Sequence, residues 1–376
     1  MRLRLLAVLA AFTLVPAASA CAATAAGPEI PATLQWRITP HQPDDGKIHF
    51  ELSYRTANSR SSYGHSLDLA ELQGLDRTAL DGAGNAPVRF RIVRDAGSFD
   101  CEGAAWRGSG TGECRFLPGA AFAAELGRRG YGTPDDAQLF HLAMAEIGRA
   151  YLETLERQAY ARPTIAELIQ AGDHGVHLAY LGEMGALGYR VGTLPALVRM
   201  RDHGVGPDYV RGVVAAGLTD LPPETLVRMR DHGVSPAYIG ELRRLGYGGL
   251  GVERLIQLRD HGISADYVGA LSQSGLTGLS LEQLVRLRDH GVGADYVARL
   301  RAAGYARLGS EDLVRLRDNG ISADYAAELR AAGYPGLAPA DLVRLRDNGV
   351  TSEFVRRVGA GGSVPVDELI RLRNGG

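Results

Sequence analysis

Residues 280–305 read "SLEQLVRLRDHGVGADYVARLRAAGY", and this stretch decides the fold of most of the chain. Ser280 followed three residues later by Gln283 is a capping box that starts a short helix. Gly291 ends that helix, and a second short helix follows and ends at Gly304. The apolar stripe of the first helix consists of Leu284, Val285 and Leu287. The stretch therefore predicts a pair of short helices.

The same pattern recurs with a period of 29 residues, as from Gly204 to Gly233. The glycine column is Gly175, Gly204, Gly233, Gly262, Gly291, Gly320 and Gly349, and the aromatic column is Tyr151, Tyr180, Tyr209, Tyr238, Tyr267, Tyr296, Tyr325 and Phe354. Two helices of this size cannot bury their apolar faces alone, whereas stacked copies can. Residues 119–376 are therefore predicted to form an α-solenoid of about eight helix pairs.

An earlier region, residues 32–118, alternates apolar and polar residues and predicts a small antiparallel β domain, a sandwich or a curled sheet. The apolar positions are Leu34, Trp36, Ile38, Ile48, Phe50, Leu52, Tyr54, Val88, Phe90 and Ile92. "GSGTG" at 108–112 lacks the Lys-Ser/Thr of a phosphate loop and is interpreted as a hairpin tip. The predicted fold class is α+β.

Cys101 and Cys114 flank this glycine-rich bend. Each shares a predicted strand face with a phenylalanine, so pairing across a hairpin is geometrically reasonable. The alternative, a redox-active thiol pair, lacks the tight C-x-x-C spacing. We predict a structural disulfide.

The N-terminus predicts export. Residues 1–20 combine two arginines, an apolar run and an Ala-Ser-Ala cleavage site, as in a signal peptide, and residues 21–31 form a linker. Neither the apolar run nor any later segment reaches the roughly 20 residues that span a bilayer. Cys21 is a candidate lipidation site of an outer-membrane lipoprotein, whereas a second cut after Ala25 would remove it. The expected location is periplasmic or secreted.

The charge balance gives no indication of a nucleic-acid partner. The formal net charge is −2, and neither nucleic acid nor an anionic membrane is implied by it.

The Asp-His-Gly triplet of the repeat suggests either a metal or catalytic site or a helix stop. Histidine gives way to asparagine in the last two copies, and both residues suit helix ends, whereas a metal ligand or general base would not be exchangeable for asparagine. We interpret the column as helix caps: His203, Gly204, His232, Gly233, His261, Gly262, His290, Gly291, Asn319, Gly320, Asn348 and Gly349.

Two arginine columns accompany the triplet. One reading is structural, in which arginines near helix C-termini suit the helix dipole and pair with the adjacent aspartates. The other is a guanidinium strip that grips carboxylates or phosphates. The candidate partner-binding residues are Arg201, Arg230, Arg259, Arg288, Arg317 and Arg346. The tyrosine column is expected in the core, since phenylalanine replaces it at 122 and 354.

No catalytic motif stands out. The sequence has no H-E-x-x-H, no G-x-S-x-G and no Walker loop, and His41, His49 and His65 have no acid at a recognisable spacing. We expect no enzyme activity, no metal and no cofactor.

The segments "FRIVRDAGSFDCEG" (90–103), "GSGTGECRFLPG" (108–119) and repeats such as "LVRMRDHGVSPAYIGELRRLGY" (226–247) resemble the extracytoplasmic C-terminal region of some antirepressor-type membrane metallopeptidases, which are related to β-lactam sensor-transducers. The zinc motif and membrane helices of those proteins are missing here, so no catalytic residue carries over. The resemblance implies a sensor-like or interaction module outside the cytoplasm.

The sequence therefore predicts an exported, non-enzymatic scaffold whose repeat surface binds an envelope protein or peptide. The alternatives are an envelope enzyme with its site in the β domain, and a glycan- or lipid-binding module that uses the arginine strip.

Overall fold

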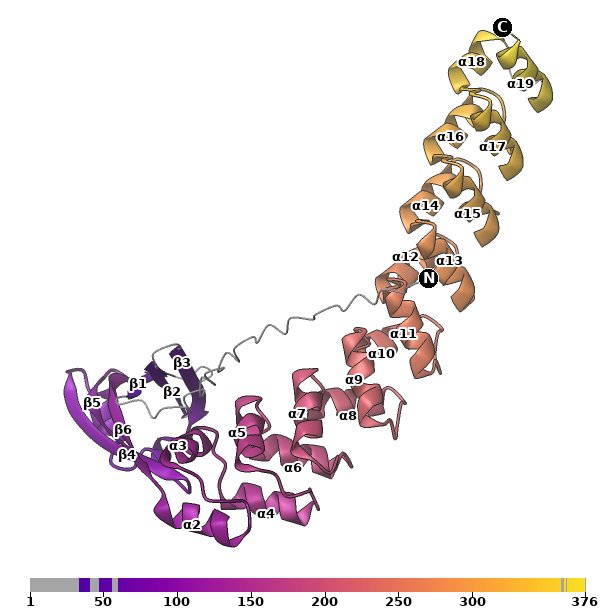
Figure 1. Ribbon diagram of the computed structural model, residues 1–376. Helices are drawn as coiled ribbons and strands as arrows, with labels where there is room; N and C mark the ends of the chain where they lie inside the picture. Colours follow the sequence, from indigo (N-terminus) through magenta and orange to yellow (C-terminus); the bar gives the residue numbers. More distant parts are fainter. Residues whose placement is uncertain (1–33, 41–46, 56–59, 360–361, 363, 376) are drawn as a thin grey trace, which may run out of the picture. The chain divides into compact units, whose positions relative to one another are not determined.

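The protein is an α+β chain with an antiparallel sheet followed by a helical array. The computed structural model describes residues 34–40, 47–55, 60–359, 362 and 364–375 (Figure 1). The predicted signal peptide, the linker, Cys21 and His41 lie outside the described residues. The chain divides between Met144 and Ala145 into two compact units.

The first unit contains one six-stranded antiparallel sheet with the order β3-β2-β1-β6-β5-β4. The strands are β1 (Leu34–Pro40), β2 (Ile48–Arg55), β3 (Arg60–Leu67), β4 (Ala86–Arg94), β5 (Gly97–Trp106) and β6 (Ser109–Pro118). The alternating apolar runs thus form strands as predicted. Strand β3 was not predicted, because its sequence "RSSYGHSL" has no apolar alternation.

The predicted hairpin tip at 108–112 is wrong in position. The turn between β5 and β6 is formed by Arg107 and Gly108, whose φ angles are 47° and 76°, and β6 begins at Ser109. Gly110 and Gly112 are strand residues against which the indole of Trp36 packs, since a Cβ there would lie 2.9 and 2.6 Å from ring atoms. These glycines therefore make room for a buried tryptophan.

Short helices complete the first unit: the 3₁₀ helix η1 (Leu69–Glu71), α1 (Arg77–Asp81), α2 (Ala120–Arg128) and α3 (Asp136–Met144). Phe140 of α3 packs its ring edge-on against the rings of Tyr54 and Phe116, 5.3 and 5.4 Å away between centroids. The sequence placed the boundary after residue 118. The helices that follow it keep the 29-residue register, but α2 and α3 belong to the compact unit of the sheet.

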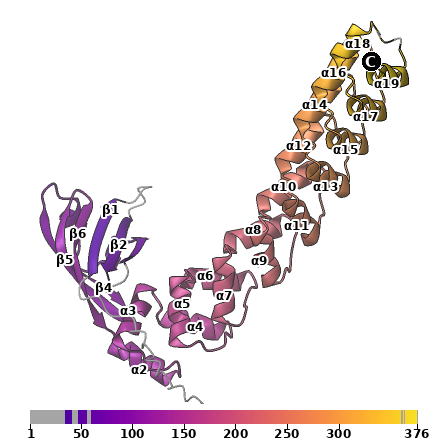
Figure 2. The ribbon, with the colours of Figure 1, turned by 45° about the horizontal axis from the view of Figure 1, so that its top comes forward.

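The second unit consists of helices in strict register. They are α4 (Arg149–Arg157), α5 (Ile165–Asp173), α6 (Leu178–Ala186), α7 (Leu194–Asp202), α8 (Pro207–Ala215), α9 (Pro223–Asp231), α10 (Pro236–Arg244), α11 (Val252–Asp260), α12 (Ala265–Gln273), α13 (Leu281–Asp289), α14 (Ala294–Ala302), α15 (Ser310–Asp318), α16 (Ala323–Ala331), α17 (Pro339–Asp347), α18 (Ser352–Arg357) and α19 (Val366–Asn374). Even-numbered helices pack on even-numbered neighbours and odd-numbered helices on odd-numbered ones. Figure 2 shows the two rows from α8 to α19.

Local rules set the length of these helices. At the start of α13 the side chain of Ser280 accepts a hydrogen bond from the backbone amide of Gln283. The side chain of Gln283 accepts one from the backbone amide of Ser280, which completes the capping box. The stop glycines of the Asp-His-Gly column have φ between 64° and 74°, the left-handed conformation that ends helices. Because start and stop signals recur every 29 residues, all helices of this unit except α18 have nine residues. None of the helices in the described ranges is long and apolar enough to span a membrane.

Candidate functional site

Hydrogen bonds between histidine and aspartate connect consecutive repeats. Nδ1 of His203 lies 2.6 Å from Oδ1 of Asp231, which is 28 residues later in the chain. The same bond joins five pairs, at 2.5–2.8 Å: His174–Asp202, His203–Asp231, His232–Asp260, His261–Asp289 and His290–Asp318. We name this series the His–Asp ladder. An ionised carboxylate only accepts, so Nδ1 carries the proton and Nε2 of a neutral ring is an acceptor.

The candidate partner-binding arginines stack on tyrosine rings of the preceding repeat. The guanidinium carbon of Arg230 lies 5.1 Å from the ring centroid of Tyr209. The pairs of this Arg–Tyr ladder, all within 5.0–5.6 Å, are Arg201–Tyr180, Arg230–Tyr209, Arg259–Tyr238, Arg288–Tyr267, Arg317–Tyr296 and Arg346–Tyr325, and Arg373 stacks on Phe354 in the same way. Such cation–π contacts contribute about 0.5–1 kcal/mol each at exposed sites. These arginines therefore hold repeats together.

The stop glycine lies beneath the same arginine. A Cβ on Gly204 would lie 3.0 Å from Nε of Arg230, and one on Gly233 would lie 3.0 Å from Nη2 of Arg259. Glycine is thus required at this position both by its positive φ and by the close approach of the next repeat.

The tyrosine hydroxyls form a third inter-repeat contact. Each donates to a backbone carbonyl 25 residues later, at 2.7–3.0 Å: Tyr151 to Val176, Tyr180 to Val205, Tyr209 to Val234, Tyr238 to Ile263, Tyr267 to Val292, Tyr296 to Ile321 and Tyr325 to Val350. Burial raises the pKa of Tyr209, Tyr238, Tyr267, Tyr296 and Tyr325 to about 12, against the opposing effect of the stacked arginine. The predicted core position is confirmed, and the hydroxyl has a role that the sequence analysis missed.

The second arginine column forms exposed ion pairs with acids at the start of the next odd-numbered helix. Arg199 contacts Glu224 through Nε and Nη2 at 3.1 Å. The corresponding pairs are Arg228–Glu253, Arg286–Glu311 and Arg344–Asp367. The sequence paired the aspartate column with these arginine columns. In the structure the carboxylates of Asp202, Asp231, Asp260, Asp289 and Asp318 accept from histidines of the preceding repeat instead.

The Asp-His-Gly histidines occupy the predicted cap positions. His174, His203, His232, His261 and His290 are C-cap residues of α5, α7, α9, α11 and α13. Asn319 and Asn348 cap α15 and α17, and their side-chain amides donate to the carbonyls of Arg315 and Arg344 at 2.8 Å. The histidine side chains do more than cap, and the one signal for this was the aspartate column in the same register.

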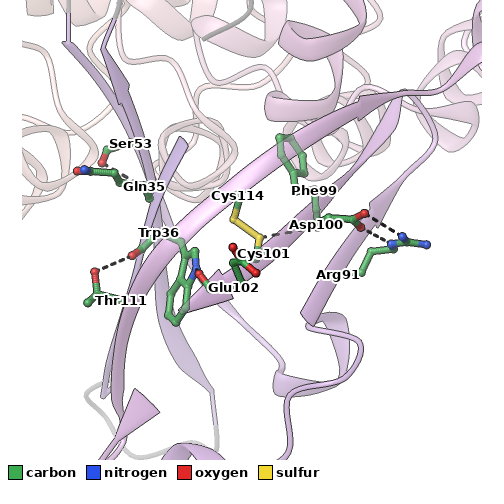
Figure 3. The surroundings of a disulfide bond; sticks show 10 residues. All are labelled: Gln35, Trp36, Ser53, Arg91, Phe99, Asp100, Cys101, Glu102, Thr111 and Cys114. Carbon is green, nitrogen blue, oxygen red and sulfur yellow. Dashed lines mark hydrogen bonds and ion pairs between the residues drawn. A yellow bond between two sulfur atoms is a disulfide. The ribbon is translucent and has the colours of Figure 1, made fainter. Parts of the chain in front are cut away.

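The outer face of the sheet carries a shallow charged groove of 760 Å³ lined by Gln73, Arg89, Phe90, Arg91, Asp100, Cys101, Glu102, Glu113, Cys114 and Arg115. Arg91 binds both carboxylate oxygens of Asp100, as Figure 3 shows. The register places Glu102 of β5 directly opposite Glu113 of β6. The groove is therefore a second polar site in the chain.

The predicted disulfide is confirmed, and it joins β5 and β6, two of the strands that carry this groove. Cys101 and Cys114 face each other in the β5–β6 register with a Cα–Cα separation of 4.0 Å, and both are buried (Figure 3). It is therefore a covalent cross-link between two adjacent strands.

Metal-binding geometry is not seen in the described ranges, where no group of three or more His, Cys, Asp or Glu side chains converges. His49 lies on β2 and His65 on β3. Searches of protein-family models and of curated protein sequences found no match to this chain.

Proposed function

We propose that the protein is a non-enzymatic interaction scaffold of the periplasm, whose helical-repeat surface binds a protein or peptide partner. The leader-like residues 1–20 and the disulfide, which needs an oxidising compartment, support export. The resemblance to the extracytoplasmic region of antirepressor-type metallopeptidases supports a sensor-like role for such a scaffold.

The observation that carries this proposal is the repetition of the inter-repeat contacts in one register. The same histidine, arginine and tyrosine contacts recur from His174 to Val350, so equivalent surface positions recur with them. A partner that meets one position meets the same chemistry on the next repeat, and weak contacts add over several units. Such linear, evenly repeated surfaces suit extended partners.

Site-specific photo-crosslinking tests the proposal. A photoreactive amino acid is placed at Asp266 or Asp295 of the even-numbered row, or at Glu253 or Glu282 of the odd-numbered row. The full chain is expressed in the organism that naturally produces it. All four side chains are exposed, and each pair is related by the 29-residue register. We expect one envelope protein to be crosslinked from both positions of one row and from neither position of the other.

Crosslinks from a single position, or equal crosslinking of the same protein from both rows, would contradict binding along the repeat surface. Far-UV circular dichroism of each variant shows that the array is folded, which the exposed positions lead us to expect.

A second candidate function rests on the groove of the sheet, where Glu102 and Glu113 oppose each other beside Arg89. Facing carboxylates can serve as acid and base, or can bind the hydroxyls of a glycan. Glycan hydrolysis or binding by the full chain that disappears in Glu102→Gln and in Glu113→Gln, but persists in Glu282→Gln, would favour this candidate over the scaffold.

A further inference from the structure

The His–Asp and Arg–Tyr ladders lie close together, because Arg230 approaches Gly204, where a Cβ would lie 3.0 Å from its Nε, while Asp231 bonds the preceding residue, His203. Arg230 precedes Asp231 directly, and His232 and Gly233 follow. One rung therefore contains a stacked arginine, an aspartate and the histidine of the preceding repeat that bonds it. Each of these side chains is at least partly exposed: in the second rung the side chains of His203 and Asp231 are 32% and 44% exposed. The ladders form one continuous surface, the rung surface.

The charges on this surface cancel when histidine is neutral. Around His203, Asp231 accepts from Nδ1, Arg230 adjoins Asp231, and Arg199, 3.5 Å from Nε2, is bound to Glu224. Two further rungs have the same charged groups, with Arg228–Glu253 beside His232 and Arg286–Glu311 beside His290. Gln170 and Gln257 replace the second arginine beside His174 and His261, and His177 follows His174. The helix C-termini add partial negative charge.

Protonation changes the rung in two ways and leaves its geometry in place. The Nδ1 proton is already donated to aspartate, so the bond of His203 to Asp231 persists in the imidazolium. The rung gains one positive charge. Nε2 changes from an acceptor to a donor and then faces another donor, the guanidinium of Arg199. Arg199 keeps its hydrogen bonds to Glu224. Histidine is the side chain that makes this change between pH 5 and 8.

We propose that the rung surface binds an acidic segment of a protein partner, and that protonation of the ladder histidines switches this binding on. Adjacent helices of one row lie about 8–10 Å apart, which is about three residues of an extended chain. An extended segment with an acidic residue at every third position thus matches the rungs, with each carboxylate accepting from an imidazolium Nε2 and attracted by the stacked arginine. The inference rests on the proposed scaffold function and adds the chemistry of the partner and its regulation.

The test uses a fluorescein-labelled poly-L-aspartate and the folded full chain at constant ionic strength. Polyaspartate remains charged at pH 5.5, and we expect it to bind at least about tenfold more tightly at pH 5.5 than at pH 7.5. The triple variant His203→Asn, His232→Asn, His261→Asn should lose most of this difference, because asparagine keeps the cap, as at Asn319, but cannot be protonated. The matched control His49→Asn, outside the ladder, should keep it.

Equal affinity at the two pH values, or a full pH effect in the triple variant, would overturn the inference. Single variants at His232 or His261 cover the case in which the triple variant fails to fold, and each should weaken binding at pH 5.5 by about twofold. Crosslinks to a partner that are unchanged between pH 5.5 and 7.5 would leave the scaffold function standing while removing this switch. Loss of row-specific crosslinks would remove the scaffold function itself.

Discussion

Asn319 does not reach Asp347, although these residues occupy the positions of histidine and aspartate in the five preceding pairs. The amide of Asn319 donates to the carbonyl of Arg315 at 2.8 Å. Among the described residues neither the guanidinium of Arg315 nor the carboxylate of Asp347 forms an ion pair or a hydrogen bond. The interface between the α15–α16 and α17–α18 pairs thus lacks two of the polar contacts found between earlier pairs.

Restoring histidine here should strengthen the end of the array. We expect Asn319→His to bond Asp347 and to raise the free energy of unfolding by about 0.5 kcal/mol, the scale of an exposed pair. Hydrogen exchange of amides in 339–357 should slow in this variant. The double variant Asn319→His, Asp347→Asn is the control, and slowing that survives in it would show that the new bond is not the cause.

The hydroxyl of Tyr238 satisfies the carbonyl of Ile263 at 2.9 Å, and both residues are buried. We expect Tyr238→Phe to lower the stability of the array by about 1–3 kcal/mol, because it leaves a buried carbonyl unpaired. Urea unfolding followed by far-UV circular dichroism measures this. Tyr238→Ala, which also removes the ring beneath Arg259, should cost more. Equal costs would assign the effect to the hydroxyl alone, and an unchanged stability of Tyr238→Phe would contradict the prediction.

Alkaline pH should unfold the array through the same tyrosines. Burial raises the pKa of Tyr209 and Tyr238 from 10.0 to about 12. The folded state therefore holds these protons more tightly than the unfolded state, and the stabilisation is complete below pH 10 and is lost as pH rises toward 12. Tyrosinate absorbance and helical circular dichroism should change together in this range. Tyrosinate formation by these residues in a fully helical array would contradict the prediction.

The disulfide should matter only to the first unit. Replacing both Cys101 and Cys114 by alanine should lower the stability of the sheet by about 3 kcal/mol, the scale for a loop this short. Trp36 and Trp106, the two tryptophans of the chain, both lie in this unit, so tryptophan fluorescence reports its unfolding. The helical transition of the array is the internal control. A shift of both transitions would mean that the two units unfold together.

Helix ends and the repeat period could be predicted from the sequence, because they depend on neighbouring residues. Ser280 with Gln283 and Gly291 fix the ends of α13 through contacts within a few residues. Strand β3 escaped prediction, since it pairs along β2 with a mostly polar sequence. The disulfide was predictable because its cysteines flank a single turn.

The contacts between repeats were harder to predict from the sequence. Whether Asp231 meets Arg230, its neighbour in the chain, or His203, 28 residues earlier, depends on how the repeats stack. The period alone does not define that stacking. Likewise, the replacement of tyrosine by Phe354 suggested that only the ring matters, whereas the hydroxyl of Tyr325 bonds Val350 of the next repeat.

Because these contacts recur at a fixed spacing, the array can lose or gain whole 29-residue units and keep its contacts between repeats. Deleting residues 233–261, one period, would join His232 to Gly262 and recreate the Asp-His-Gly triplet. His232 would then meet Asp289 in place of Asp260, and Tyr209 would meet the carbonyl of Ile263 in place of Val234. Unequal crossing-over within the gene can thus shorten or lengthen the reach of the protein, and no new pair of complementary side chains has to evolve.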